Sequence, residues 1–187
     1  MKSNILEQLQ NANLSKQVVE LCRDEIEGHD FLGYIHGIGD EYLLMHVIDG
    51  EIRPNGFSCL RISDIKKCEL PYRYSSFVES ALELQGHTLT NLPEVDLNSA
   101  KNILTSIESM KSTVPLVTLH YEYIDPDICV IGRIADIGEN ELQLIHINPD
   151  ASWDIQPTAQ TLENITRIDF LHGYEEALYL VATSGCT

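Results

Sequence analysis

The alternation of hydrophobic and polar positions predicts the same series of elements twice along the chain. Each series opens with apolar residues at helical spacing, and Ser3 and Ser99 stand where N-caps are expected. Short runs rich in β-branched and aromatic residues follow, separated by turns of Gly, Asp and Asn. A second apolar-rich helical segment closes each series. We therefore expect each half of the chain to run helix, five strands, helix.

The ten expected strands lie at matching places in the two halves. They are 18–26, 31–38, 42–48, 57–62 and 65–68 in the first half, and 116–123, 128–134, 142–147, 158–162 and 165–170 in the second. Taken alone, 18–26 also suits a helix, because several of its residues favour one. Its partner 116–123 is rich in β-branched and aromatic residues, so the match decides for a strand.

Residue identities repeat together with the elements. The Asn-Ile-Leu of 4–6 recurs at 102–104, and the Leu-Met-His-Val of 44–47 matches the Leu-Ile-His-Ile of 144–147. Matches in one order, with small insertions and deletions where turns are expected, indicate an internal duplication. The sequence therefore divides into a first repeat at 1–84, a linker at 85–101 and a second repeat at 102–187.

The two repeats need a way to protect their strand edges. An isolated five-stranded sheet of this length would expose its edges and leave one face in water. Bending the strands into a small barrel removes both problems. Gly33 and Gly132 lie within strands, where glycine permits a sharp bend or a close backbone approach. The predicted fold is mainly β with flanking helices (α+β): two tandem five-stranded small barrels, each with a short N-terminal helix and a closing helix.

Two segments resemble Sm-like proteins. Residues 33–44 are similar to the first conserved Sm segment, with a glycine, alternating apolar residues, an acidic turn and an apolar strand, and 132–144 give a second version. The Leu-Arg-Ile-Ser-Asp-Ile of 60–65 resembles the element before the last strand of Sm-like and SH3-like barrels. The chain is thus similar to uncharacterised bacterial proteins with this barrel, here in tandem. This resemblance concerns fold more than activity.

The resemblance does not carry an RNA site over to this chain. The second Sm segment normally brings an Arg-Gly pair into the RNA-binding loop, whereas Arg61 is followed here by Ile62 and Thr161 by Leu162. Single Sm-like barrels bury their free strand edges by forming rings. The resemblance and the edge argument together lead us to expect that the two repeats pack against each other, and that the outermost edges support a homodimer.

The net charge of the chain argues against some classes of binding partner. Twelve Lys and Arg residues stand against 29 Asp and Glu residues, a net charge of −17 in 187 residues. This balance argues against nucleic acid and against an anionic membrane surface, because both are bound through Lys and Arg. No stretch approaches the ~20 apolar residues of a membrane span. The odd number of cysteines, with no Cys-x-x-Cys pair, suits a reducing compartment, so we expect a cytoplasmic protein.

Three residues are candidates for binding a ligand or a partner. His46 and His146 occupy matching places in the third strand of each repeat, where a histidine can be a ligand, a proton donor or simply a hydrogen-bonded strand residue. We favour the last of these, because no second ligand stands at a fixed spacing. Trp153 lies in a loop with no counterpart in the first repeat. It can serve as a binding anchor or fold back over its barrel, and both alternatives stay open.

Two other clusters of residues are candidate sites. Arg61, Lys66, Lys67 and Arg73 form a basic cluster near tyrosines, which could contact nucleic acid. A solvated strand end, balanced by nearby acidic residues, is the favoured interpretation. Oxygen and nitrogen ligands for a cation could come from His120, Glu122, Asp125 and Asp127. Because Asp-Pro-Asp at 125–127 is an ordinary turn sequence, we expect no metal and no cofactor there.

No catalytic motif stands out, so we name no catalytic residue. Gly-x-Ser-x-Gly, His-Glu-x-x-His and Gly-rich phosphate loops are all absent from the sequence. The first hypothesis is a non-enzymatic cytoplasmic protein that binds a protein partner or a small ligand. The second is an Sm-like RNA-binding protein that uses the first repeat. A hydrolase that uses histidine and carboxylate groups is the weakest alternative.

Overall fold

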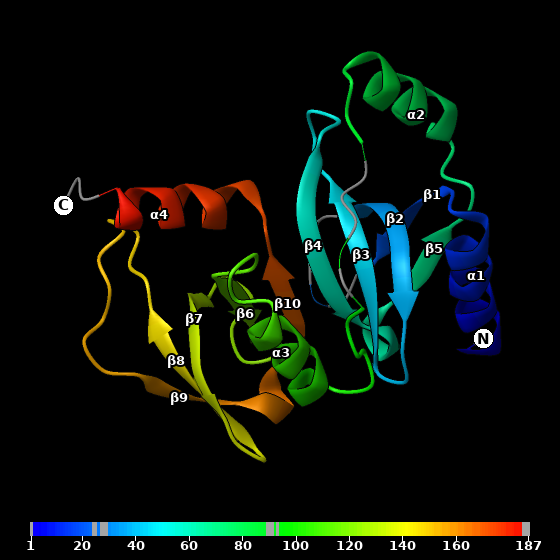
Figure 1. The fold of residues 1–187 in the computed structure, drawn as a ribbon. Helices are drawn as coiled ribbons and strands as arrows, with labels where there is room; N and C mark the ends of the chain where they lie inside the picture. Colours follow the sequence, from blue (N-terminus) through cyan, green and yellow to red (C-terminus); the bar gives the residue numbers. More distant parts are fainter. Residues whose placement is uncertain (1, 24–25, 27–29, 89–91, 93, 185–187) are drawn as a thin grey trace.

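The computed structural model describes residues 2–23, 26, 30–88, 92 and 94–184 (Figure 1). The first half of the chain contains α1 (Lys2–Ser15), β1 (Val18–Cys22), β2 (Phe31–Ile38), β3 (Tyr42–Ile48), β4 (Pro54–Arg61), η1 (Ile62–Asp64), β5 (Lys67–Glu69) and α2 (Ser75–Leu84). The second half contains α3 (Ala100–Ser109), β6 (Val117–His120), β7 (Cys129–Ile137), β8 (Glu141–His146), β9 (Thr158–Thr161), η2 (Leu162–Asn164), β10 (Arg167–Phe170) and α4 (Gly173–Thr183). The order of elements is therefore the same in both halves, as the pattern predicts.

All ten strands join in one open antiparallel sheet. Its strand order is β5-β1-β2-β3-β4-β10-β6-β7-β8-β9. The prediction of two closed five-stranded barrels is therefore wrong. The reason lies in the middle of the sheet, where β4 pairs with β10 over four residue pairs, from Leu60 opposite Arg167 to Phe57 opposite Phe170. This pairing satisfies the backbone groups of one edge from each half, so neither half needs to close on itself. The expectation that the halves pack together through strand edges is confirmed.

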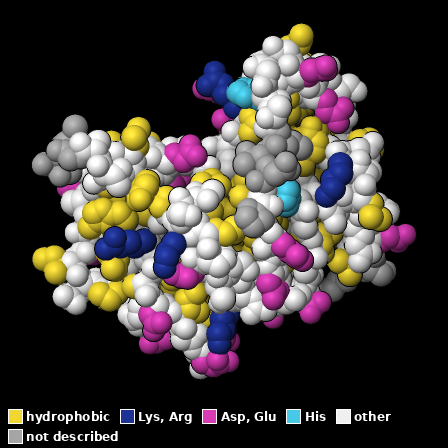
Figure 2. Space-filling model, in the orientation of Figure 1, with side chains coloured by type: hydrophobic (Ala, Val, Ile, Leu, Met, Phe, Trp, Pro, Cys, Tyr) yellow, Lys and Arg dark blue, Asp and Glu magenta, His cyan; other side chains and the backbone are white. Residues whose placement is uncertain are grey.

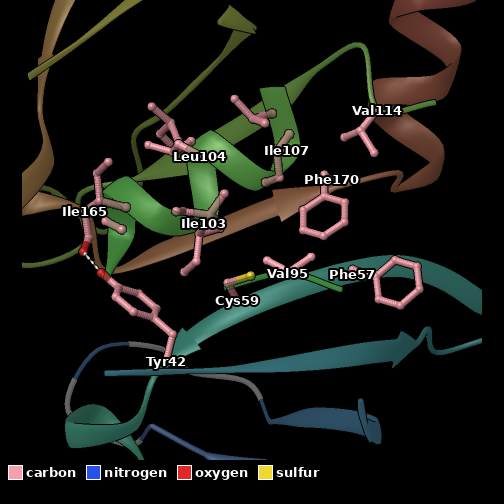
Figure 3. Close-up of a cluster of buried hydrophobic side chains, with 14 of the residues drawn as sticks. Tyr42, Phe57, Cys59, Val95, Ile103, Leu104, Ile107, Val114, Ile165 and Phe170 are labelled. Carbon is pink, nitrogen blue, oxygen red and sulfur yellow. Dashed lines mark hydrogen bonds between the residues drawn. The ribbon is translucent and has the colours of Figure 1, made fainter. Parts of the chain in front are cut away.

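Strands β3 and β4 belong to two cores at once, because successive strand residues point to opposite faces. Leu43 and Leu60 lie in a buried cluster with α1 and β1. Their neighbours Leu44 and Cys59 lie in a second cluster, which contains α3 and the strands of the second half. Figure 3 shows Cys59 and Phe57 of β4 in this second cluster, beside Ile103 and Phe170. The two halves therefore share a strand pair and form one body.

Local signals at the helix ends are partly confirmed. The Ser99 side chain accepts a hydrogen bond from the backbone N–H of Asn102, as an N-cap does. In contrast, α1 begins at Lys2, so Ser3 lies within the helix and the predicted cap is wrong. The strand expected at 18–26 is present up to Cys22; residues 24, 25 and 27–29 lie outside the described part. No helix in the described residues is both long enough and apolar enough to cross a membrane.

The described end of the segment that the sequence marks as a linker, residues 94–101, lies at the junction of the halves. Val95 and Leu97 are buried in the second-half core. The backbone N–H of Tyr42 donates to the Leu97 carbonyl at 3.1 Å, and a Cβ on Gly39 would lie 2.5 Å from the same carbonyl oxygen. Only glycine allows the segment to pass this close to the β2–β3 turn. This contact holds the β2–β3 turn beside the segment that leads into α3, and both line a groove between the halves.

Candidate functional site

A groove of about 1290 Å³ runs between the two halves. The first half supplies the start of α1, the turn between β2 and β3, η1 and β5, and the second half supplies the start of α3, the turn between β7 and β8, and η2. Its apolar lining includes Ile5, Ile62, Ile65, Ala100 and Leu162. The groove therefore exists only because β4 and β10 hold the halves side by side.

Charges of both signs border this groove. Four of the twelve Lys and Arg residues of the chain line it: Arg61, Lys66, Lys67 and Lys101. Four acidic residues also line it: Asp40, Glu41, Glu139 and Glu163. Lys101 forms an ion pair with Glu139, and Lys66 and Lys67 each take part in an interaction of their own. Lys101 is thus compensated at the groove, and a polyanion would meet four carboxylates among the cations.

Arg61 and Tyr42 link the first half to the end of η2. The Tyr42 hydroxyl donates to the Ile165 carbonyl at 2.9 Å, the contact drawn as a dashed line in Figure 3. The Arg61 guanidinium donates to the same carbonyl and, at 3.1 Å, to the carbonyl of Glu163. Burial raises the pKa of Tyr42, so this phenol remains a donor at neutral pH. We call these two donors and the carbonyls of Glu163 and Ile165 the junction clamp.

The structure brings together three of the four residues in the predicted basic cluster. Arg61, Lys66 and Lys67 line the groove, whereas Arg73 lies outside it and forms an exposed ion pair with Glu69 at 2.9 Å. The space-filling view in Figure 2 shows Lys and Arg side chains only in small, scattered groups on that face, with acidic side chains around them. The face seen there offers no continuous basic surface for a phosphate backbone.

The matching of His46 with His146 is wrong by one residue. Tyr42 of β3 pairs with the last residue of β4, and Glu141 of β8 pairs with the last residue of β9. His46 lies four residues after Tyr42, and Ile145 lies four residues after Glu141. The residue that corresponds to His46 is therefore Ile145. A shift of one residue turns a strand side chain to the opposite face of the sheet. The two histidines therefore have different surroundings and do not form a repeated site.

His46 is a core residue at the junction of the halves. Its ring stacks on Phe57 with the centroids 4.4 Å apart, and the side chain is almost fully buried. Burial, with smaller contributions from His36 and His172, lowers the pKa of His46 to about 4. A neutral imidazole packed in this way is a strand residue beside the core, but the predicted hydrogen bond is not made: its buried Nδ1 has no partner among the residues described. His146, in contrast, hydrogen-bonds through Nε2 with Thr158 and with Gln160 of β9, at 3.2 Å from the Gln160 Nε2.

Trp153 folds back onto its own half. It forms an isolated β-bridge with Ile147 and is half-buried against the small cluster that contains Leu178 of α4. The Arg133 guanidinium lies 4.8 Å from the centre of its ring, at a distance typical of cation–π contacts. Of the two alternatives left open by the sequence, this placement corresponds to the covering role.

A buried ionic cluster that the sequence did not reveal as a unit lies beside the junction. Glu122 accepts from Arg23 of the first half and lies 3.2 Å from Arg167 of β10. Asp169 lies 2.9 Å from His120 and 3.1 Å from the Nε of Arg167. The guanidinium groups of Arg23 and Arg167 are 5.7 Å and 5.3 Å from the ring centre of Phe31. This cluster links the two halves on the sheet face opposite the junction clamp.

The charges within this ionic cluster hold one another in the ionised state. Burial raises the pKa of Asp169, but Arg167 and His120 outweigh it and hold that pKa well below its usual range. For Glu122, burial is likewise outweighed by Arg23, Thr166 and Arg167, so its pKa is lowered. The role of such a network is to fix how the halves fit, because removing one member leaves an uncompensated buried charge.

His120 and Glu122 are therefore taken up by contacts within this cluster, which accounts for the alternation that also suggested a cation site. Among the residues that the structure describes, no group of three or more His, Cys, Asp or Glu side chains is placed to hold a metal ion. A usable signal for the cluster was present in the sequence: Arg167 and Asp169 flank an apolar residue within a strand. Charges on one face of an interior strand require buried partners.

No protein-family model matches the chain, and neither a curated protein nor a solved structure matches it. The resemblance to Sm-like proteins therefore stays a prediction. The function must be argued from the groove and from the edges of the sheet.

Proposed function

We propose that this chain is a non-enzymatic binding protein whose groove holds an extended segment of a partner protein. The groove itself carries the proposal. Its volume of about 1290 Å³ exceeds the ~300–1,000 Å³ of typical small-molecule sites. It combines an apolar floor with rims of both charges, which suits a peptide better than a small apolar ligand or a polyanion.

The position of β5 supports a peptide in particular. This strand stands at one end of the sheet and pairs with β1, and its residues Lys67 and Cys68 line the groove. An end strand presents backbone N–H and C=O groups along its outer edge, and these groups pair readily with an added strand. A peptide in the groove can therefore bind through its main chain while its side chains contact the apolar floor.

RNA remains the second candidate, because Arg61, Lys66 and Lys67 do share one groove. The four acidic residues on the same rims argue against it. At physiological salt we expect RNA to bind no more tightly than a non-specific Kd on the order of 10⁻⁴ to 10⁻⁶ M. Self-association through the two end strands, β5 and β9, stays a prediction that sedimentation at several protein concentrations tests.

Selection from a random-peptide library tests the proposed function. Ser63 is exposed in the groove, so Ser63→Trp places a bulky ring within it, whereas Ser80→Trp places the same side chain on the exposed surface of α2 as a matched control. We expect peptides selected on the natural chain to bind Ser63→Trp at least tenfold more weakly and the control equally well. Equal binding to all three proteins contradicts the proposal. So does sub-micromolar binding of mixed-sequence RNA that disappears when Lys66 and Lys67 are changed to Ala.

A further inference from the structure

The junction of the two halves already contains one strand bound to the edge of another. Strand β4 lies antiparallel along β10 and brings Phe57 opposite Phe170, with the two rings stacked and their centroids 5.6 Å apart. Beyond the last pair, Arg61 of the same strand donates to the carbonyls of Glu163 and Ile165. The strand that β10 accepts therefore has a bulky apolar residue at one end and an arginine at the other.

Strand β5 corresponds to β10 in the ladder of its own half. Lys67 pairs with Cys22 at the end of β1, as Arg167 pairs with His120 at the end of β6. One residue before each pair, a backbone N–H donates to the same strand end: Lys66 to the Cys22 carbonyl at 2.8 Å, and Thr166 to the His120 carbonyl at 2.9 Å. The two strands differ in their second neighbour: β10 also pairs with β4, whereas β5 is the end of the sheet, and its residues Lys67 and Cys68 line the groove.

The acceptor side of the junction clamp is also duplicated. Each short helix, η1 and η2, closes with the same backbone hydrogen bond, from Ile65 to Ile62 and from Ile165 to Leu162, both at 3.2 Å. The carbonyls that correspond to those of Glu163 and Ile165 are therefore those of Ser63 and Ile65, and both residues line the groove. The donor side has no such counterpart, because the residues that correspond to Tyr42 and Arg61 are Glu141 and Thr161, at the other end of the sheet.

We propose that β5 binds a partner strand in the way that β10 binds β4. This inference rests on the proposed function and names the chemistry of its partner. The bound strand runs antiparallel to β5, places a bulky apolar residue near its start, and ends in an arginine. The guanidinium of that arginine donates to the carbonyls of Ser63 and Ile65. Asp40 and Glu41, exposed on the same groove, and the net charge of −17 favour a basic end on the partner.

A second copy of this chain fits the site poorly. Strand β9 is at the other end of the sheet and carries Thr-Ala-Gln-Thr. It offers neither a bulky apolar residue nor an arginine, and Glu141 and Glu163 beside it would bring negative charge towards Asp40 and Glu41. The occupant that matches is therefore a strand from a different protein.

A synthetic peptide that copies residues 54–62, Pro-Asn-Gly-Phe-Ser-Cys-Leu-Arg-Ile, is the probe. Fluorescence anisotropy measures its binding to the full chain, to Ser63→Trp and to the control Ser80→Trp. We expect binding to the natural chain and to the control, and loss of binding to Ser63→Trp. Replacing the peptide arginine by alanine should weaken binding about tenfold, because charge-assisted hydrogen bonds to two carbonyls are lost.

Methylation of the peptide backbone separates strand pairing from other modes. N-methyl groups on alternate residues that face one edge should abolish binding, whereas the same groups on the other edge should leave it unchanged. Equal effects on both edges overturn the inference. Library peptides that require the open groove but carry no arginine, together with a β4 peptide that does not bind, overturn it and leave the proposed function standing. If no peptide of either kind depends on Ser63, both fail.

Discussion

Strands β10 and β5 carry the same pattern of charge in two different environments. Strand β10 begins with Arg167, Ile168 and Asp169, and β5 consists of Lys67, Cys68 and Glu69, each a run of a cation, an apolar residue and an acid. The first lies in the middle of the sheet, between β4 and β6, and the second lies at its end.

This difference shows how one strand pattern can serve two purposes. In the middle of the sheet the charges are buried and form the ionic cluster that links the halves. At the end of the sheet Lys67 and Glu69 are at least partly exposed, and Glu69 pairs with Arg73 in solvent. Buried charges depend on their partners, whereas water screens exposed ones. The covered strand is thus structural, whereas β5 pairs with a strand on one side only.

The largest effect is expected when the aromatic stack between β4 and β10 is removed. Phe57→Ala should reduce the free energy of unfolding by about 4 kcal/mol, because it leaves a cavity between His46 and Phe170. Phe77→Ala on the exposed surface of α2 is the control and should change stability by less than about 0.5 kcal/mol. Urea unfolding of both variants measures the difference. Similar losses would mean that the junction does not hold the fold together.

The second prediction compares the same charge in the two environments. Asp169→Asn keeps the size of the side chain but leaves the Arg167 charge without this partner, so we expect a loss of about 3 kcal/mol. The corresponding change at the edge, Glu69→Gln, should leave stability within experimental error, because Glu69 and Arg73 meet in solvent. The assay is chemical denaturation at neutral pH. A large effect of Glu69→Gln would show that β5 is covered in solution.

The third prediction concerns pH. Burial, and to a smaller extent His36 and His172, lowers the pKa of His46 in the folded state to about 4. In the unfolded state the pKa of a histidine is about 6.5, so on acidification the unfolded chain binds this proton at a higher pH than the folded chain does. Between these two values the unfolded state binds more protons. Stability from His46 is therefore fully present above about pH 6.5 and declines as pH falls towards 4, by at most about 1.4 kcal/mol per pH unit.

His46→Phe provides the control for this slope. It removes the titrating group and keeps a ring that can stack on Phe57. Denaturant titrations at several pH values should give a flatter profile for this variant between pH 6.5 and 5, above the range in which carboxylates with unfolded pKa values near 4 contribute. Parallel profiles for the two proteins would contradict a neutral, buried His46.

The smallest loss of stability is expected at the junction clamp. Tyr42→Phe removes the hydrogen bond to the Ile165 carbonyl and should cost about 1 kcal/mol. Tyr74→Phe, which removes a hydroxyl from an exposed side chain, should have almost no effect. Thermal unfolding monitored by circular dichroism can resolve this difference. Equal melting temperatures for the two variants would show that Arg61 alone maintains the clamp.

Elements could be predicted from the sequence far better than sites. Turns of Gly, Asp and Asn and runs of β-branched residues located the ten strands, and the repeat rescued the Val18–Cys22 strand, whose composition also suits a helix. The match between His46 and His146 in the two repeats was wrong by one residue. A sequence match tolerates such a shift, whereas the register of β3 with β4 fixes the face of the sheet to which each side chain points. Of the predicted basic residues, Arg73 is separated from the groove by its own ion pair with Glu69.

The amino-acid sequence was enough to predict the series of elements, because helices, strands and turns follow from local propensity and from the period of the hydrophobic pattern. It did not determine whether β4 would pair with the last strand of its own half or with that of the other. Both pairings satisfy the same backbone groups. Only the tertiary structure decided for β10, where the stacked rings of Phe57 and Phe170 and the donors of Tyr42 and Arg61 come together from distant parts of the chain. That decision left β5 at the end of the sheet and opened the groove beside it.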